Sequence, residues 1–147
     1  ADYPAALLAL GATIVTNRRE VAAESFFTGL FETALDEGEI VTAITFTAPA
    51  KAGYEKFRNP ASRYAMTGVF VANGDGGVRV AVTGAGDNGV YRETALEAAL
   101  AKNFEPSALE GMTVSSDNMM SDIHASAEYR ANLVVVMAKR AVAAANA

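Results

Sequence analysis

The sequence GAGDNG at residues 84–89 is the stretch whose residue types and spacing most resemble a chemical motif. It has the glycine spacing G-x-G-x-x-G of loops that hold the pyrophosphate of a dinucleotide at the start of a helix. That function requires a helix to begin inside the motif and a second parallel strand to follow. Here the third glycine is followed by VYR, and helix-favouring residues begin only at Glu93. We therefore expect residues 84–89 to form a loop rather than a nucleotide-binding turn.

Other residue types that commonly carry catalysis are sparse. His124 is the one histidine and the chain has no cysteine, so a metal site would have to be built almost wholly from carboxylates. The lack of cysteine also excludes a disulfide framework, a thiol nucleophile and ligation of an iron–sulfur cluster by this chain. Glu37 and Glu39 flank Gly38, which indicates a solvated turn rather than an acid/base pair. We expect no self-contained catalytic centre.

Composition indicates a folded domain and argues against several classes of protein. The 147 residues are 51% hydrophobic, and they carry a formal net charge of −5 without a basic stripe. This charge argues against a nucleic-acid partner. No apolar run approaches the roughly 18–20 residues that a membrane-spanning helix needs, and no signal peptide is recognisable. We expect a cytoplasmic protein, either free or peripheral at the inner face of the membrane.

The second half of the chain predicts an antiparallel sheet. Residues 54–57, 64–73 and 78–83 favour strands, the last with three valines on one face. NGDGG at residues 73–77 contains Asn-Gly and Asp-Gly, which adopt positive φ readily and favour a hairpin turn. Residues 93–102 favour a helix. Strands followed by helices, without βαβ alternation, indicate the α+β class, with a three-stranded antiparallel sheet packed with helices.

The chain ends in a long helix that we expect to begin at Asp122. The Asp122 carboxylate could accept the free N–H groups of the first turn, and its charge suits the helix dipole there. Beyond it, residues recur at helical spacing on one face, and Val134 and Val135 widen the apolar arc. This pattern predicts a deeply packed helix in which Tyr129 and Leu133 are buried.

The first half of the chain predicts shorter elements. Residues 2–11 favour a short helix, with Asp2 near the N-cap and Gly11 at the C-cap. Residues 12–16 and 39–48 favour strands. After them comes the small, turn-prone sequence PAKAG, which we interpret as the boundary between two parts of the chain.

Three motifs, in this order, resemble those of a known family. They are DYPAALLALGA at residues 2–12, FFTG followed by GEIVT at residues 26–42, and D-x-x-x-S-x-x-Y-R before an apolar helix at residues 122–130. The chain is similar to the flavoprotein, or medium, subunit of aerobic molybdenum-containing carbon monoxide dehydrogenase, within the xanthine dehydrogenase family. The resemblance covers nearly all of the chain but only the C-terminal half of a family member. It implies that residues 1–48 are the C-terminal part of an FAD-binding domain and residues 49–147 the flavoprotein's C-terminal domain.

The resemblance also implies which residues meet FAD, the expected cofactor. Asp2 matches an aspartate that hydrogen-bonds the ribityl chain of the flavin. Arg58 matches a basic residue, usually lysine, that contacts the flavin, and Tyr64 matches a tyrosine that covers one face of the isoalloxazine ring. The departures are arginine for lysine, which differ in geometry and hydration, and Ser62-Arg63 where Gly-Asp is common. From the residues alone, Arg58 would be a surface cation and Tyr64 a half-buried strand residue.

What the resemblance implies about function is electron transfer. The complete subunit would pass electrons from iron–sulfur clusters through FAD to an acceptor, beside an iron–sulfur small subunit and a molybdopterin large subunit. The family's two glycine-rich loops for the FAD pyrophosphate lie upstream of this sequence, so the chain alone is not expected to be active. One alternative is a non-catalytic module for subunit docking or assembly. Another is the flavoprotein subunit of a related xanthine, aldehyde or nicotine-type dehydrogenase, because the molybdenum subunit selects the substrate.

Overall fold

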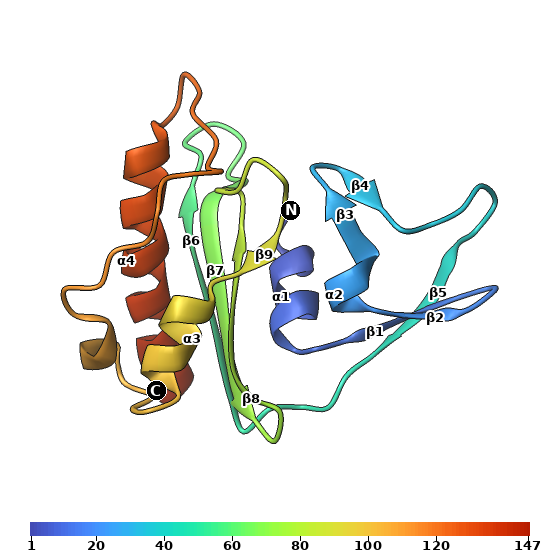
Figure 1. The fold of residues 1–147 in the computed structure, drawn as a ribbon, viewed down its shortest axis with the longest axis horizontal. Coiled ribbons are helices and arrows are strands. Elements are labelled where there is room, and N and C mark those ends of the chain that lie inside the picture. Colours follow the sequence, from blue (N-terminus) through green and yellow to red (C-terminus); the bar gives the residue numbers. More distant parts are fainter.

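The computed structural model describes residues 1–147, whose larger part is built on a four-stranded antiparallel sheet in the order β6-β7-β8-β9 (Figure 1). The elements of this part are β6 Lys51–Arg58, β7 Ala65–Gly74, β8 Gly77–Thr83, β9 Tyr91–Arg92, α3 Thr94–Leu100, the 3-10 helix Pro106–Leu109 and α4 Ala127–Asn146. Antiparallel strands packed with helices confirm the α+β class expected from the sequence.

The N-terminal part consists of shorter elements. They are α1 Tyr3–Ala9, β1 Thr13–Thr16, β2 Glu20–Ala22, α2 Ala23–Phe26, β3 Phe27–Gly29, β4 Glu32–Thr33 and β5 Val41–Thr45. β1 lies between β2 and β5 in a three-stranded antiparallel sheet, and β3 pairs with β4. The strands expected at residues 12–16 and 39–48 correspond to β1 and β5. Every residue of β5 is exposed, so this small sheet leaves apolar side chains such as Ile44 in contact with solvent.

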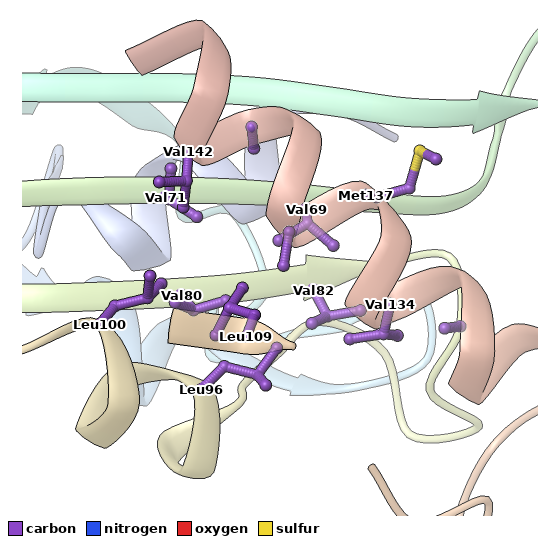
Figure 2. Packing of buried hydrophobic residues seen from close by; sticks show 13 residues of the cluster. Val69, Val71, Val80, Val82, Leu96, Leu100, Leu109, Val134, Met137 and Val142 are labelled. Atoms are coloured by element: carbon purple, nitrogen blue, oxygen red, sulfur yellow. The ribbon is translucent and has the colours of Figure 1, made fainter. Parts of the chain in front are cut away.

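Most of the core lies between one face of the large sheet and the helices α3 and α4 (Figure 2). The cluster contains valines of β7 and β8, leucines of α3 and of the 3-10 helix, and apolar residues of α4: Val69, Val71, Val80, Val82, Leu96, Leu100, Leu109, Val134, Met137 and Val142. The valine alternation predicted for residues 78–83 is confirmed. A Cβ at Gly53 of β6 would collide with the carbonyl oxygen of Ala141, so glycine allows α4 to lie close to this strand.

The opposite face of the large sheet is covered by α1. Ala5, Leu8 and Ala9 of this helix pack against Ala72 of β7 and Ala81 of β8. Successive side chains of a strand point to opposite faces. One set of residues of β7 and β8 therefore packs against α4, and the other set packs against α1. The first helix of the chain therefore packs against the large sheet. The division into two domains at residues 48 and 49 stays a prediction.

The large sheet differs from the prediction in two ways. β6 begins at Lys51, inside the expected boundary segment, because its pairing with β7 continues as far as Asn73. A fourth strand, β9, pairs with Ala81 and Val82 of β8 through two residues only. A strand of two residues has no periodicity for a sequence to display. The expected three strands are present, and tertiary pairing adds the fourth.

The terminal helix begins later than expected. Ser126, not Asp122, is the N-cap of α4, and its hydroxyl accepts the N–H of Tyr129 at 3.2 Å. Asp122 accepts the N–H groups of His124 and Ala125 at 2.9 and 3.1 Å and closes a separate turn before the helix. Both residue types can cap helices, and the prediction chose the wrong one of the two.

Burial along α4 follows the prediction in part. Leu133 is 4% exposed, as expected. The prediction that Tyr129 is buried is wrong, because this residue is 44% exposed. Its ring, in the first turn of the helix, meets the ring of Phe57 edge-on at a centroid distance of 6.1 Å and otherwise faces solvent. Although α4 has 20 residues, no helix of the structure combines the length and apolarity that crossing a membrane requires.

Replacing Met137 with alanine is expected to lower the free energy of unfolding by about 2–5 kcal/mol, because the substitution removes buried contacts and leaves a cavity. Met137 is fully buried between α4 and the sheet. Chemical denaturation measures the effect. Arg140→Ala is the control, since Arg140 is exposed on the same helix and its loss should cost less than about 0.5 kcal/mol. Equal effects of the two substitutions would contradict the packing of α4.

Candidate functional site

Asp2 occupies the N-cap position of α1, as the sequence predicts, but its side chain makes no capping hydrogen bond. It reaches β6 instead. Its Oδ1 accepts from the hydroxyl of Tyr54 at 2.6 Å, and its Oδ2 accepts from Nζ of Lys56 at 2.8 Å. The carboxylate therefore links the start of the chain to the first strand of the large sheet.

Tyr54 and Lys56 can share one carboxylate because side chains two positions apart in a strand point to the same face. The Tyr54 ring also stacks on the ring of Phe70 of β7, at a centroid distance of 6.1 Å. Gly68 of β7 leaves room for the hydroxyl: a Cβ at this position would lie 2.5 Å from it. The geometry of the Asp2 contact thus depends on four strand positions that lie far from Asp2 in the sequence.

The protonation states of this group follow from its contacts. Burial raises the pKa of the Asp2 carboxyl, but hydrogen bonds from Lys56 and Tyr54 outweigh it, and the pKa is lowered from its usual value. Burial, followed by the hydrogen bond to Asp2, raises the pKa of the Tyr54 hydroxyl above its ordinary range. At neutral pH the group therefore contains an ionised carboxylate and a neutral phenol, able to accept and donate hydrogen bonds respectively.

Arg58 and Tyr64 lie at the two ends of the loop that connects β6 with β7. Asn59 organises this loop, because its side-chain oxygen accepts the N–H groups of Ala61 and Ser62 at 3.0 and 3.3 Å. Its own N–H donates to the carbonyl of Tyr64 at 2.9 Å. Tyr64 directly precedes β7 instead of starting it, and its side chain is 42% exposed. The loop thus holds a partly exposed aromatic ring at a fixed place in the chain.

Arg58 ends β6 and is exposed, and it forms none of the structure's ion pairs. Its positive charge opposes the increase in the pKa of Tyr54, and it lies two positions after Lys56, the partner of Asp2, in β6. The structure therefore brings Asp2 and Arg58 to one region through β6. No hydrogen bond joins the side chains of Tyr64 and Asp2.

Lys56 is the residue of this region that sequence reasoning missed. The available signal was the spacing of Tyr54 and Lys56, two positions apart in the strand predicted at residues 54–57, which puts both on one face. The carboxylate that binds Lys56 belongs to Asp2, 54 positions earlier in the chain. No local pattern connects residues at that separation.

Residues 84–89 form the expected loop. No helix begins inside the motif, because α3 starts at Thr94, after β9. Some backbone groups of the loop already form hydrogen bonds within the chain. The carbonyl of Ala85 accepts from the N–H of Met120 at 2.9 Å, and the N–H of Asp87 donates to the carbonyl of Asn118 at 3.0 Å. These bonds attach the loop to the segment before α4, and no helix N-terminus is present in it to bind a pyrophosphate.

Glu39 differs from the expectation of a solvated turn, because it is 6% exposed. Nε and Nη2 of Arg19 each donate to its carboxylate at 2.9 Å, joined by the amide of Asp36 at 2.8 Å and the hydroxyl of Thr16 at 2.7 Å. The Arg19 guanidinium, with these further donors, lowers the pKa of Glu39 to about 2. Glu39 therefore anchors the loop before β5 and is not available as a base.

Arg130 of α4 is a fully buried charge, 1% exposed. Its Nη1 donates to the carbonyls of Met66 and Gly84 at 2.6 and 3.0 Å, and its Nη2 donates to the carboxylate of Asp122 at 2.8 Å. The His124 amide, together with Arg130, lowers the pKa of the Asp122 carboxyl. One side chain thus ties α4 to the start of β7 and the end of β8, beside the Tyr64 loop.

Comparison with known proteins gives this geometry a context. Residues 1–49 match the model of the FAD-binding domain in molybdopterin dehydrogenase. The chain is 28% identical to the carbon monoxide dehydrogenase medium chain of Hydrogenophaga pseudoflava and 30% identical to the nicotine 6-hydroxylase medium subunit of Paenarthrobacter nicotinovorans. These alignments cover 98% and 99% of this chain, and 55% and 56% of the two relatives.

The fold agrees with the sequence comparison. Reconstituted carbon monoxide dehydrogenase from Oligotropha carboxidovorans contains a chain that superposes with a TM-score of 0.76 at 27% identity, over 98% of this chain and 56% of that chain. The expected resemblance is confirmed. The chain spans about half the length of the curated relatives it matches.

The match to the FAD-binding domain divides the site. Asp2 lies inside the matched residues 1–49, whereas Lys56, Arg58 and Tyr64 lie beyond them. The contact between Asp2 and Lys56 therefore joins the matched segment to the rest of the chain. The roles of Asp2, Arg58 and Tyr64 toward a flavin stay predictions.

Replacing Asp2 with asparagine is expected to lower the pKa of the Tyr54 hydroxyl toward its ordinary value. The amide keeps a hydrogen-bond acceptor but loses the negative charge that opposes ionisation of the phenol. An alkaline NMR titration of protein with labelled tyrosine measures this pKa, with Asp87→Asn as the control because Asp87 is exposed in the glycine loop. An unchanged titration of Tyr54 would show that the Asp2 contact does not persist in solution.

Proposed function

We propose that this chain is part of the FAD-binding medium subunit of a molybdenum hydroxylase, an oxidoreductase subunit that passes electrons from iron–sulfur clusters through FAD to an acceptor. The observation that supports this most is the match of residues 1–49 to an FAD-binding domain, continued by the contact of Asp2 with Lys56. Bound FAD would supply the redox chemistry, while residues of the chain bind and orient it.

The residues present suit the isoalloxazine and ribityl end of FAD. Tyr64 offers a partly exposed ring of the kind that stacks on a flat heterocycle. Arg58 contributes a cation without a carboxylate partner, and Asp2 contributes a carboxylate with lone pairs to spare. We assign Asp2 to the ribityl chain, Arg58 to the polar edge of the flavin and Tyr64 to a face of its ring. Lys56, held by Asp2, adds a second cation to the region.

The same residues do not suit the pyrophosphate of FAD. Tight binding of this dianion needs several backbone N–H groups that converge on it. The two glycine-rich stretches are the β7–β8 hairpin turn at residues 74–77 and the bonded loop at residues 84–89. We expect the required donors in a part of the complete subunit outside these 147 residues.

Partners and substrate are a finer part of the proposal. We assign an iron–sulfur small subunit and a molybdopterin large subunit as partners, and carbon monoxide as substrate of the complete enzyme, because two similar medium chains come from carbon monoxide dehydrogenases. The 30% identity to a nicotine 6-hydroxylase subunit favours a related dehydrogenase as the second candidate. A docking module without a catalytic part is a third, supported by the exposure of Ile44 and Phe46, at 44% and 54%.

The 147-residue chain alone is expected to fold but to lose FAD. A few hydrogen bonds contribute a net ~0.5–1.5 kcal/mol each, whereas association costs an estimated ~4–15 kcal/mol in lost freedom. The purified chain is mixed with FAD and dialysed, and its visible absorbance is recorded. A yellow complex that retains one flavin per chain would place the pyrophosphate donors inside these residues and contradict the assignment.

In the complete subunit, Tyr64→Ala is expected to shift the visible spectrum of the flavin and to weaken FAD binding roughly two- to tenfold, the scale of one aromatic stacking contact. Tyr129→Ala is the matched control, because Tyr129 is 44% exposed and Tyr64 is 42% exposed. Absorbance spectra and flavin titrations compare the two. If both variants kept the wild-type spectrum and affinity, Tyr64 would not contact the flavin.

A further inference from the structure

A cleft of about 240 Å³ lies where three segments from different parts of the chain meet. They are the end of α1 at Leu10 and Gly11, the connection between β5 and β6 at residues 47–49, and the β7–β8 hairpin. Figure 1 shows the hairpin and this connection together at the lower end of the molecule. The cleft is separate from the Asp2 group, and its lining contains one arginine, Arg79 of β8.

Arg79 differs from the other arginines of the fold. Five of the eight arginines are exposed, and three are not: Arg79, Arg92 and Arg130. Arg92 and Arg130 form ion pairs with carboxylates. Arg79 has neither an ion pair nor a hydrogen bond. The N–H donors of a guanidinium without a protein partner are free, so an anion that entered the cleft would gain a charge-assisted contact.

Glycines shape the space around this guanidinium. A Cβ at Gly11 would collide with Nη1 of Arg79, and the backbone there has a φ of +58°, which favours glycine. A Cβ at Gly76, in the hairpin, would lie 3.5 Å from Nη2. The guanidinium of Arg79 therefore lies between the end of α1 and the hairpin, where it lines the cleft.

We propose that this cleft binds a small oxyanion, a phosphate or carboxylate group, through Arg79. The planar guanidinium presents paired N–H donors that match the oxygens of either group. The volume is below the ~300 Å³ at which pockets for larger ligands begin, so the ligand is smaller than a dinucleotide. The site does not depend on the proposed flavin function, since none of the residues assigned to FAD lines it.

Asp75 at the tip of the hairpin is the one carboxylate in the lining, and it makes no ion pair with Arg79. Its negative charge opposes the entry of an anion. Replacing Asp75 with asparagine should therefore strengthen binding, which gives the proposal a variant expected to gain function and not only variants expected to lose it.

The test titrates the 147-residue chain with inorganic phosphate and, separately, with acetate, at constant ionic strength kept with sodium chloride. NMR follows the amide signals of Gly11 and Gly76 and the side-chain Nε–H of Arg79. Saturation by phosphate or by acetate identifies the preferred group. Arg79→Gln should weaken binding about tenfold or more, as expected for loss of a charged hydrogen-bond donor. Arg140→Gln removes the same charge from an exposed position and should leave the affinity for the anion unchanged.

Two results would overturn the proposal. One is the absence of saturation with both anions at these three signals. The other is an equal effect of Arg79→Gln and Arg140→Gln, which would mean that anions respond only to overall charge. If circular dichroism shows that Arg79→Gln is unfolded, Asp75→Asn decides the question: affinity several-fold above that of the unmodified chain supports the site, and unchanged or weaker affinity overturns it. FAD takes no part in these measurements, so they succeed or fail independently of the flavin assignment.

Discussion

The central strands β7 and β8 carry buried apolar residues on both faces of the sheet, and the rest of the structure depends on covering both. On one side, Val69 and Val71 of β7 pack under α4; on the other, Ala72 and its neighbours pack against α1. Because α1 covers the second face, the first helix of the chain packs against a sheet whose strands lie much later in the sequence. The position of α1 then decides where Asp2 lies, and so decides which strand its carboxylate can reach.

The candidate site is a consequence of that packing. With α1 in place, Asp2 stands opposite the same face of β6 that carries Tyr54 and Lys56, and one carboxylate binds both. The family model matches only the segment that contains Asp2, while the aromatic and cationic groups come from the strand and loop beyond it. In the proposed function, a flavin bound here would therefore contact both parts of the chain.

A buried arginine joins the elements that surround this region. Arg130 donates to Met66 and Gly84, at the start of β7 and the end of β8, and to Asp122 before α4. Charged hydrogen bonds in a dry environment are strong, and they fix the directions of the backbone carbonyls that accept them. The Arg130 contacts therefore limit how far the segment after Tyr64 can move. Asn59 closes the same loop from its other end.

The sequence by itself determined the elements whose residues repeat. Alternating valines predicted β8, Asn-Gly and Asp-Gly predicted its hairpin, and the apolar arc around Val134 predicted α4, because these patterns are local and follow the period of a strand or a helix. Motif order also determined the resemblance and directed attention to Asp2, Arg58 and Tyr64. Only the tertiary structure decided the partners and the burial of individual side chains. Asp2 binds Lys56 instead of capping its own helix, and Tyr129 is half exposed. Ser126 caps α4, while Asp122 pairs with Arg130. The contact of Asp2 with Lys56 spans 54 positions, which no local period encodes. Ser126 and Asp122 act locally, but Arg130 is also bound by the carbonyls of Met66 and Gly84, which only the packing of β7 and β8 brings to it.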